Sequence, residues 1–518
     1  MPQSLRPQGA APDLRAAILL TAALTLARLA ALFATPLELY PDEAQYWLWS
    51  RSLDFGYYSK PPMIAWAIWA STQIGGDAEA WIRAPAALFQ AGATLLTFLI
   101  GRRLFDAPTG LAAAALYGLM PGVQLSALVA ATDAPLLFFL GLSLLAYTVF
   151  LTPAEPRRRR LLAAGLGASL GLAFLSKYAA VYFVVGLALH LALSREARRA
   201  WTPASAAAAT LALAAVLAPN LAWNATHGFA TFQHTAANAA WSGVHLFNIG
   251  EMGAFLGSQF GVFGPIPLGA LILGVGLAIR GRAVEGRAIR REDLLLLCFT
   301  LPPILIVTGQ AFISRANANW SGAGYLAGAI LVAAWLMRWR ARLWLRTAVA
   351  IQAGVAAFFL AAVISPALAD KAGLANGLKR ARGWSDTADL ILDRAWREPG
   401  LTAIAVNNRF LFYATAYYGR DRLAERGVPL TSWLLMEGPR NQAETAAPLT
   451  DDLGGKVLMV SYEGWRRAEM QADFARASGL EIGSVRLDAK RKRRIEMFVG
   501  EDFAPRPRDP VSGLPIRP

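Results

Sequence analysis

Apolar runs close to twenty residues long recur along the first two thirds of the chain. A helix needs about 20 apolar residues to cross a bilayer, so the pattern predicts a polytopic membrane protein. We expect eleven membrane-spanning helices, at residues 14–35, 80–101, 109–128, 134–152, 161–176, 178–194, 204–222, 255–279, 293–309, 321–337 and 345–366. The first run has no convincing cleavage site and is interpreted as a retained span. The predicted fold is an all-α membrane bundle over residues 1–366.

The pattern changes after Ala367, where charges of both signs become frequent. Residues 367–505 are expected to form a small α/β domain, which is long enough to bury a core of its own. We expect short strands and two helices, with strands at 401–408, 456–463 and 493–500 and helices at 384–398 and 470–480. Ser385 is the expected N-cap of the first of these helices. Residues 506–518 are rich in proline and are expected to be a disordered tail.

The net charge of +15 is explained by membrane topology rather than by nucleic-acid binding. Cytoplasmic loops of membrane proteins carry an excess of Lys and Arg. Alternate loops between the predicted spans hold eighteen arginines, within residues 102–103, 157–160, 195–199, 280–291 and 338–346, whereas the opposite loops hold few basic residues. This asymmetry predicts a cytoplasmic N-terminus and a periplasmic C-terminal domain. The loops at Asp42 and Asp133, and loops 223–254 and 310–320, are then expected on the outer side.

The segment Glu38–Pro62 is an unusually polar interruption between two apolar runs. It contains the adjacent carboxylates Asp42 and Glu43, several aromatic residues, and Lys60 directly before a double proline. Such a segment cannot lie in hydrocarbon, where each unpaired backbone group costs several kcal/mol. A carboxylate and a cation at the membrane surface suit an anionic lipid-linked substrate. On spacing alone, a loop whose charges merely face water is an equally good interpretation.

Other ionisable residues are expected at the outer ends of spans, and such groups often mark a substrate pathway. They are Arg83, Asp133, Lys177 and, in loop 310–320, Arg315. Asp133 also fits a purely structural role as the N-cap of the next span. Lys177 also fits a cation that extends to the interface.

Several motifs are absent from the sequence. There is no phosphate-binding G-x-x-x-x-G-K-[ST] motif and no D-x-D motif, and the histidines in loop 223–254 match no ligand spacing. No cofactor is therefore expected, although these observations leave a divalent metal open. The sequence has a single cysteine, Cys298, which lies in an apolar run. Because a disulfide needs two cysteines, the chain can form no internal disulfide.

Five motifs in order resemble those of bacterial family-39/83 glycosyltransferases, relatives of the protein O-mannosyltransferases and of the lipid A aminoarabinose transferase. The motifs are YPDEAQYWLWSRSLDFGYYSKPPMIAW, WIRAPAAL, VAATDAPLLF, LAFLSKYAA and SRANANW, within the first 340 residues or so. The resemblance implies a GT-C fold in the bacterial inner membrane. It also implies inverting transfer of a sugar from a polyprenyl-phosphate donor to a periplasmic acceptor, which would be lipid A, lipopolysaccharide, another envelope glycan or a protein.

The resemblance assigns roles to individual residues. Asp42 corresponds to the catalytic base, Lys60 to a ligand of the donor phosphate, and Asp133 to a second catalytic acid. The SRANANW stretch is the weaker match, because the aminoarabinose transferase is rich in lysine there. The full set of expected substrate-binding residues is Glu43, Tyr57, Tyr58, Lys60, Arg83, Lys177, Arg315 and Asn319.

The chemistry of this set agrees with glycosyl transfer. A base must accept the acceptor proton, which contributes about 10²–10⁴-fold in rate, and cations must stabilise the departing phosphate. The alternative function is a transporter or flippase of a lipid-linked glycan, since a charged outer cavity fits both. A transporter more often shows internal repeats and interrupted helices in both halves, and the sequence shows no convincing repeat.

Overall fold

The computed structural model describes residues 10–238, 247–285, 289–435, 438–509 and 516. The chain divides into two compact units. The helical unit comprises Met1–Ala34, Asp54–Gly56 and Lys60–Ala361. The C-terminal unit comprises Thr35–Leu53, Tyr57–Ser59 and Ala362–Pro518. Most of the polar segment between the first two apolar runs is therefore packed with the C-terminal unit.

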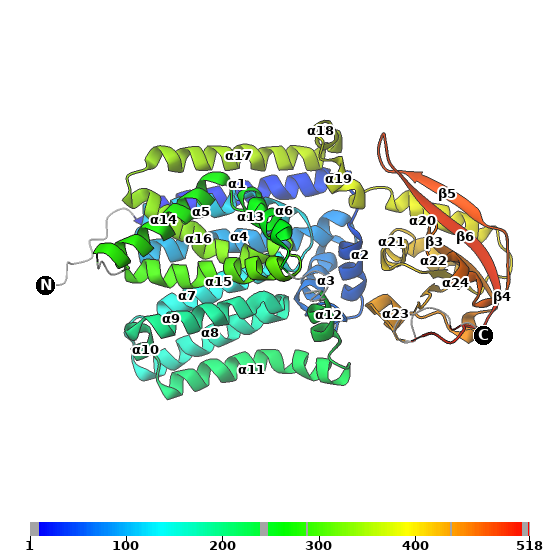
Figure 1. Ribbon diagram of the computed structural model, residues 1–518, viewed down its shortest axis with the longest axis horizontal. Helices are drawn as coiled ribbons and strands as arrows, with labels where there is room; N and C mark the ends of the chain where they lie inside the picture. The colour runs from blue at the N-terminus through cyan, green and yellow to red at the C-terminus, as the bar shows by residue number, and fades with distance from the viewer. Residues whose placement is uncertain (1–9, 239–246, 286–288, 436–437, 510–515, 517–518) are drawn as a thin grey trace. The chain divides into compact units, whose positions relative to one another are not determined.

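Helices, many of them long and apolar, make up the helical unit (Figure 1). They are α1 (Ala10–Ala34), α3 (Met63–Gly75), α4 (Glu79–Leu104), α5 (Ala107–Gly118), α6 (Pro121–Leu128), α7 (Asp133–Phe150), α8 (Pro156–Ser176), α9 (Val181–Leu193), α10 (Arg195–Ala200), α11 (Pro203–Thr226), α12 (Ala230–Asn238), α13 (Ile249–Val262), α14 (Pro265–Glu285), α15 (Arg291–Ile313), α16 (Tyr325–Arg338) and α17 (Arg342–Ile364), with short 3₁₀ turns at Tyr178–Ala180 and Ala318–Gly324.

Helices lie at every predicted span, but the predicted number of eleven spans is not confirmed. Within the described ranges, seven helices are long and apolar enough to cross a membrane, or up to nine if each of two bent pairs counts as one span. Helix α8 begins at Pro156 and continues with four consecutive arginines, Arg157–Arg160, which shorten its apolar part. Residues 178–193 also form only a short apolar helix.

Two of the predicted spans are bent helix pairs rather than single helices. Helices α5 and α6, predicted as one span at 109–128, meet at 59°, and α13 and α14, predicted as one span at 255–279, meet at 115°. Pro121 starts α6 and Pro265 starts α14, and proline lacks the N–H that a continuing helix needs. At the sharper bend Gly264 has φ = +97°, which a residue with a side chain adopts only with strain.

Buried side chains satisfy the backbone carbonyls that these bends release. The Gly118 carbonyl accepts hydrogen bonds from Arg28 Nη2 at 2.5 Å and Gln124 Nε2 at 2.6 Å. The Phe263 carbonyl accepts one from Gln352 Nε2 at 2.9 Å. An unpaired carbonyl inside a bilayer would cost several kcal/mol, so these polar side chains allow the helices to bend within the bundle.

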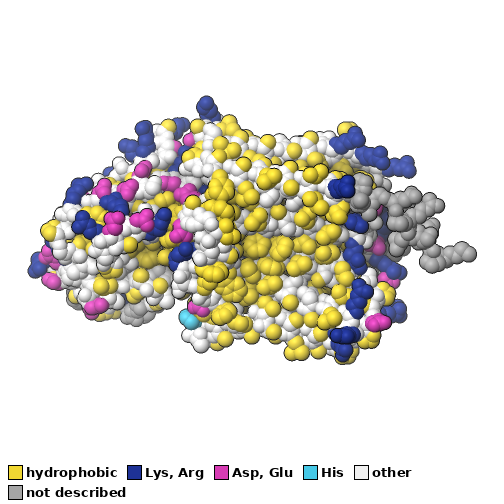
Figure 2. Space-filling model, turned by 180° about the vertical axis from the view of Figure 1, so that it is seen from behind, with side chains coloured by type: hydrophobic (Ala, Val, Ile, Leu, Met, Phe, Trp, Pro, Cys, Tyr) yellow, Lys and Arg dark blue, Asp and Glu magenta, His cyan; other side chains and the backbone are white. Residues whose placement is uncertain are grey.

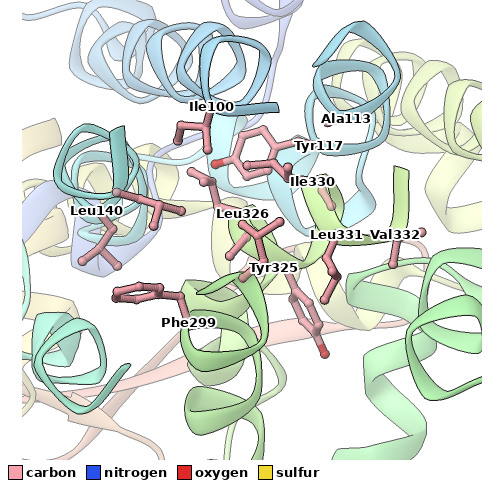
Figure 3. Close-up of a cluster of buried hydrophobic side chains, with 14 of the residues drawn as sticks. Ile100, Ala113, Tyr117, Leu140, Phe299, Tyr325, Leu326, Ile330, Leu331 and Val332 are labelled. Atoms are coloured by element: carbon pink, nitrogen blue, oxygen red, sulfur yellow. The ribbon is translucent and has the colours of Figure 1, made fainter. Parts of the chain in front are cut away.

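The core of the helical unit surrounds α16, whose residues from Tyr325 to Leu336 are all buried. Figure 3 shows Leu326, Ile330 and Leu331 of this helix among side chains of neighbouring helices such as Tyr117 and Leu140. The flank of the unit exposes apolar side chains, and Lys and Arg gather at one end of it (Figure 2). This is the distribution expected of a bundle with lipid at its sides and one basic, water-facing end.

A six-stranded mixed sheet forms the centre of the C-terminal unit. Its strands are β1 (Ala403–Val406), β2 (Leu430–Ser432), β3 (Lys456–Tyr462), β4 (Phe474–Ala477), β5 (Glu481–Arg486) and β6 (Lys492–Phe503). The order is β2-β1-β3-β6-β4, with β5 also paired to β6. Strand β1 runs parallel to β2 and β3, while β6 is antiparallel to β3, β4 and β5.

Short helices complete the C-terminal unit. They are α2 (Pro41–Ser50), α18 (Pro366–Lys371), α19 (Ala375–Leu378), α20 (Trp384–Trp396), α21 (Arg409–Tyr418), α22 (Arg420–Arg426), α23 (Gln442–Ala446) and α24 (Arg467–Gln471). The predicted strands at 401–408, 456–463 and 493–500 are confirmed by β1, β3 and β6. The predicted helix at 470–480 is wrong, because residues 474–477 form β4 and pair with β6.

The expected N-cap role of Ser385 is also wrong. Helix α20 begins one residue earlier, at Trp384, after Gly383 in the left-handed conformation. The carboxylate of Glu38 accepts hydrogen bonds from the backbone N–H groups of Trp384 and Ser385. A residue from the first polar segment therefore caps a helix far along the chain, and a carboxylate at a helix N-terminus is favourable because of the helix dipole.

Part of the expected disordered tail is bound to the domain. Arg508 is buried and pairs with the fully buried carboxylate of Asp473, which also accepts hydrogen bonds from Trp433 Nε1 and the Arg506 N–H. The guanidinium of Arg508 lies 5.1 Å from the Trp433 ring centroid. Residues 510–515 and 517–518 lie outside the described residues.

Candidate active site

Helix α2 carries the acidic pair and forms for local reasons. Pro41 occupies its first turn together with Asp42 and Glu43, where proline and carboxylates are both favoured. The Glu43 carboxylate folds back and accepts a hydrogen bond from the Tyr40 N–H at 2.9 Å. Glu43 is fully buried, whereas the Asp42 side chain is 51% exposed. The adjacent carboxylates thus point in different directions, and only Asp42 faces outward.

Arg409 holds the Asp42 side chain. Its Nη1 atom donates to Asp42 Oδ1 at 2.8 Å and to Gln45 Oε1 at 2.7 Å. Arg409 is the first residue of α21, which packs against α2 with the ring centroids of Trp47 and Tyr417 4.9 Å apart. The carboxylate is therefore positioned but accessible, as a general base must be.

Asp42 lies in the wall of a cleft of about 350 Å³ within the C-terminal unit. The residues that line it are Tyr40, Pro41, Asp42, Asn376, Gly377, Lys379, Arg380 and Phe410. Among these described lining residues two are cations and one, Asp42, is a carboxylate, and Arg409 adds a third cation beside Asp42. This arrangement suits a ligand that presents both a hydroxyl and a negative charge.

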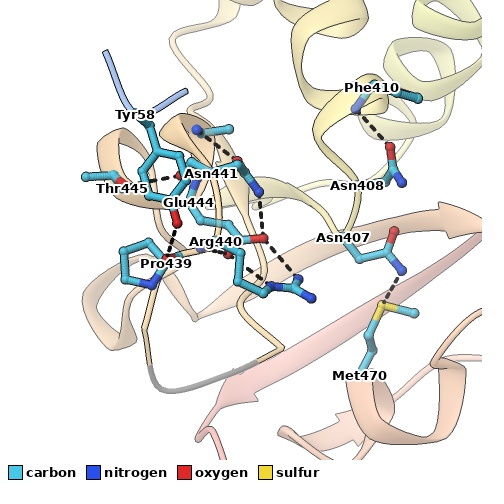
Figure 4. A network of polar contacts seen from close by, with 11 residues as sticks. Tyr58, Asn407, Asn408, Phe410, Pro439, Arg440, Asn441, Glu444, Thr445 and Met470 are labelled. Atoms are coloured by element: carbon cyan, nitrogen blue, oxygen red, sulfur yellow. Dashed lines mark hydrogen bonds and ion pairs between the residues drawn. The ribbon is translucent and has the colours of Figure 1, made fainter. Parts of the chain in front are cut away.

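Tyr57 and Tyr58, two expected substrate-binding residues, hold the polar segment in place. Tyr57 is buried, stacks on Trp49 with centroids 4.6 Å apart, and donates its hydroxyl to the carbonyls of Trp49 and Ser52. Tyr58 donates its N–H to Gln442 at 2.8 Å. Its hydroxyl donates to the Pro439 carbonyl at 3.2 Å (Figure 4). Burial and the nearby Glu444 raise the pKa of the Tyr58 hydroxyl. These contacts support packing of the segment.

In the helical unit three expected site residues meet. Lys177 Nζ lies 2.9 Å from Asp133 Oδ1, and Asn319 Nδ2 lies 3.4 Å from Asp133 Oδ2. Asp133 is not the N-cap of α7, because Thr132 holds that position and no side-chain cap bond forms. Lys177 ends α8 in an extended conformation, which directs it to a carboxylate rather than only to the interface. A lysine held in place by a carboxylate in this way can donate a charge-assisted hydrogen bond to a phosphate.

The remaining expected residues also belong to the helical unit but differ in exposure. Lys60 is half-buried and precedes α3, Arg83 is 3% exposed within α4, and Arg315 is exposed. Asp54, six residues before Lys60, accepts a hydrogen bond at Oδ2 from Trp223 Nε1 at 2.7 Å. This contact anchors the part of the polar segment that stays with the helical unit. The burial of Arg83 makes it less suited to direct contact with a substrate than Lys60 or Arg315.

The sequence interpretation missed three cations near Asp42, namely Lys379, Arg380 and Arg409. They are separated from Asp42 by more than 330 residues, and no motif connects them. One signal was available for Arg409, which follows the carboxyl end of β1, the position where α/β sheets usually bind ligands. No grouping of metal-ligand side chains is found among the residues described here.

The chain is similar in sequence to known proteins. The family model for dolichyl-phosphate-mannose-protein mannosyltransferase matches residues 59–223. The lipid A galacturonosyltransferase RgtD of Rhizobium johnstonii is 35% identical over 451 residues, which cover 86% of this chain and 91% of RgtD.

Solved structures agree with this at the level of the fold. The crystal structure of ArnT from Cupriavidus metallidurans in the apo state matches with a TM-score of 0.64 and 17% identity, over 93% of this chain and 97% of that chain. The same protein bound to undecaprenyl phosphate matches with a TM-score of 0.60 over the same shares. The similarity to RgtD over nearly the whole length of both chains shows the family, and the chain therefore belongs to the GT-C membrane glycosyltransferases of the ArnT and protein mannosyltransferase type.

Proposed function

We propose that the protein transfers a sugar from a polyprenyl-phosphate donor to lipid A at the outer face of the inner membrane. The observation that carries this proposal is the relationship to a lipid A galacturonosyltransferase across 91% of that protein's length. The ArnT fold, known in a complex with undecaprenyl phosphate, supports the donor class. Galacturonic acid, the sugar named for RgtD, is the first candidate for the transferred group.

Asp42 acts as the general base in this proposal. It accepts the proton of the acceptor hydroxyl as the hydroxyl oxygen attacks the anomeric carbon, and the polyprenyl phosphate leaves from the opposite face. Its exposed carboxylate, held by Arg409, supports this role. Lys60 and Lys177 stabilise the departing phosphate, and Asp133 orients Lys177 through their ion pair. The polar groups of Arg315 and Asn319 extend the donor site.

The reaction takes place on the periplasmic side, with the N-terminus in the cytoplasm. The basic loops that gather at one end of the helical unit support this orientation, because Lys and Arg favour the cytoplasmic side. Alkaline phosphatase fused to the C-terminus should be active and green fluorescent protein at the same point dark. The reverse pattern would place the C-terminal unit in the cytoplasm.

Mass spectrometry of lipid A tests the function. Deletion of the gene should remove a species heavier by one hexuronosyl residue, and the wild-type gene should restore it. Purified protein should convert lipid A to that species only when a polyprenyl-phosphate sugar is added. If the lipid A profile of the deletion strain were unchanged and another envelope glycan or protein had lost a sugar, that molecule would be the acceptor in place of lipid A. Repeating the purified reaction with a chelator tests the expectation that no metal is needed.

The transporter alternative is not favoured. Bent helix pairs do occur in both halves of the helical unit, as they do in many transporters. The related proteins described above are nevertheless transferases. In the purified reaction a transferase forms a new glycosidic bond without any membrane gradient, which a flippase does not.

A further inference from the structure

We propose that Lys379, Arg380 and Arg409 form an anion-binding subsite for the acceptor. The subsite holds a phosphate or carboxylate group of the acceptor saccharide next to Asp42. This inference rests on the proposed function, because it takes Asp42 as the group that receives the acceptor proton. All four residues belong to the C-terminal unit.

The cleft carries more positive than negative side chains. Lys379 and Arg380 line it together with Asp42. The Asp42 carboxylate already receives a hydrogen bond from Arg409, so it does not offset all of the positive charge. Within the described lining of the cleft there is no second carboxylate. An anionic ligand would complete the charge balance.

One aromatic ring positions two of the three cations. The guanidinium carbon of Arg409 lies 4.5 Å from the ring centroid of Phe410, and that of Arg380 lies 5.7 Å from it. Contacts of this kind stabilise a cation over a ring and reduce the conformational entropy lost when a ligand binds. Phe410 and Arg380 both line the cleft, and Arg409 adjoins it through its hydrogen bond to Asp42.

The position of the cleft in the fold favours an anion as well. Arg409 begins α21 directly beyond the carboxyl end of β1, which has parallel neighbours on both sides. Ligands of α/β sheets bind at the carboxyl ends of parallel strands. The N-terminus of the following helix carries partial positive charge, which adds to that of the three side chains.

The direction of the reaction identifies the acceptor as the source of the anion. In a displacement with inversion, the attacking oxygen and the leaving phosphate lie on opposite faces of the anomeric carbon. Asp42, as the base, lies on the side of the attacking oxygen. Cations in the same cleft are therefore on the acceptor side, away from the donor phosphate.

The test uses the full-length protein in detergent and the variants Lys379→Ala, Arg380→Gln and the double variant. Lys490→Ala is the matched control, because Lys490 is an exposed cation of the same unit outside the cleft. Three acceptors are compared: lipid A with its phosphates, the same lipid A after their removal, and lipid A with uronic acids in their place. KM is measured separately for acceptor and donor.

The KM for the anionic acceptor should rise about tenfold in each single variant, as expected for loss of one charge-assisted hydrogen bond. The donor KM, the reaction of the uncharged acceptor and the Lys490→Ala enzyme should be unchanged. The acceptor whose KM rises, either the phosphate form or the uronate form, identifies the anion that the subsite binds. A rise in the donor KM, or an equal loss with the uncharged acceptor, would overturn the proposal.

A binding measurement separates this inference from the proposed function. Native mass spectrometry compares retention of lipid A with and without phosphates by wild-type and double-variant protein, and needs no turnover. If wild-type protein transfers no sugar to lipid A, the proposed function fails. Phosphate-dependent retention that is lost in the double variant would still support the subsite, and retention independent of phosphate or of the variant would overturn it.

Discussion

Arg409 donates a 2.8 Å hydrogen bond to the carboxylate of Asp42, although 367 positions separate the two residues in sequence. The same Nη1 atom binds Gln45, one turn further along α2. The N-terminus of α21 thereby fixes the side chain of the candidate base. The carboxylate of this candidate base is thus positioned by a side chain of the C-terminal unit, for which the sequence motifs assigned no function.

Replacing Arg409 by Gln should lower kcat about tenfold, because a base that loses its orientation spends less time in a reactive geometry. Arg409→Lys should recover part of the loss, since the ammonium group keeps the charge but not the planar guanidinium. Arg422→Gln is the matched control, because Arg422 pairs with Asp389 and Asp393 on the surface of the same unit. A change in the acceptor KM alone, with kcat intact, would rule out a positioning role.

The ion pair of Asp133 and Lys177 should behave as one functional unit. Lys177→Ala and Asp133→Asn should each raise the donor KM about tenfold, because each removes or misplaces a charge-assisted contact to phosphate. The double variant should be little worse than either single variant, since contacting residues are not additive. Donor KM values from a double-mutant cycle measure this. Fully additive losses would show that the two residues act independently.

Arg508→Ala should destabilise the C-terminal unit, because it leaves the buried carboxylate of Asp473 without its cation. The cost of breaking such a pair is about 3–5 kcal/mol. Burial raises the pKa of Asp473 above its ordinary value, so the folded state keeps its proton to higher pH than the unfolded state does. Protonated Asp473 therefore stabilises the folded state at low pH. This stabilisation is lost as the pH rises through the pKa that Asp473 has in the folded protein.

The defect of Arg508→Ala should therefore be larger at pH 7.5 than at pH 4.5. Unfolding followed by tryptophan fluorescence at both values measures it. Arg476→Ala is the control, since Arg476 pairs with Glu501 and Asp502 at an exposed position. An equal loss at the two pH values would mean that the Asp473 charge is not responsible.

The apolar pattern predicted the elements whose formation depends on local sequence. Spans followed from the length of apolar runs, and β1, β3 and β6 from short runs rich in Val and Ile. Bends at Pro121 and Pro265 were missed, because apolar character continues across each proline. The segment 470–480 has Ala, Met and Gln, which favour a helix, but Phe474 and its neighbours gain more by pairing with β6.

The site was predictable where motifs exist and not where only the fold brings residues together. Resemblance pointed to both Asp42 and Glu43, but in the structure Asp42 is exposed whereas Glu43 is fully buried. The polar segment was expected as a loop, yet Pro41, Asp42 and Glu43 form a favourable first turn and start α2. Arg380 and Arg409 reach the cleft only through tertiary packing, which no local pattern records.

The central claim is that Asp42 is the base, and comparison of Asp42→Asn with Glu43→Gln tests it most directly. Sugar transfer from a radiolabelled polyprenyl-phosphate donor is measured in membranes at matched protein level, with donor binding and detergent stability as controls. Asp42→Asn keeps size and hydrogen bonding but cannot accept a proton, so activity should fall by about 10²-fold or more with normal folding and donor binding. Glu43→Gln should lose less, because its amide oxygen can still accept from the Tyr40 N–H. If Asp42→Asn kept more than about a tenth of wild-type activity, well short of the loss expected for a base, Asp42 would not be the base.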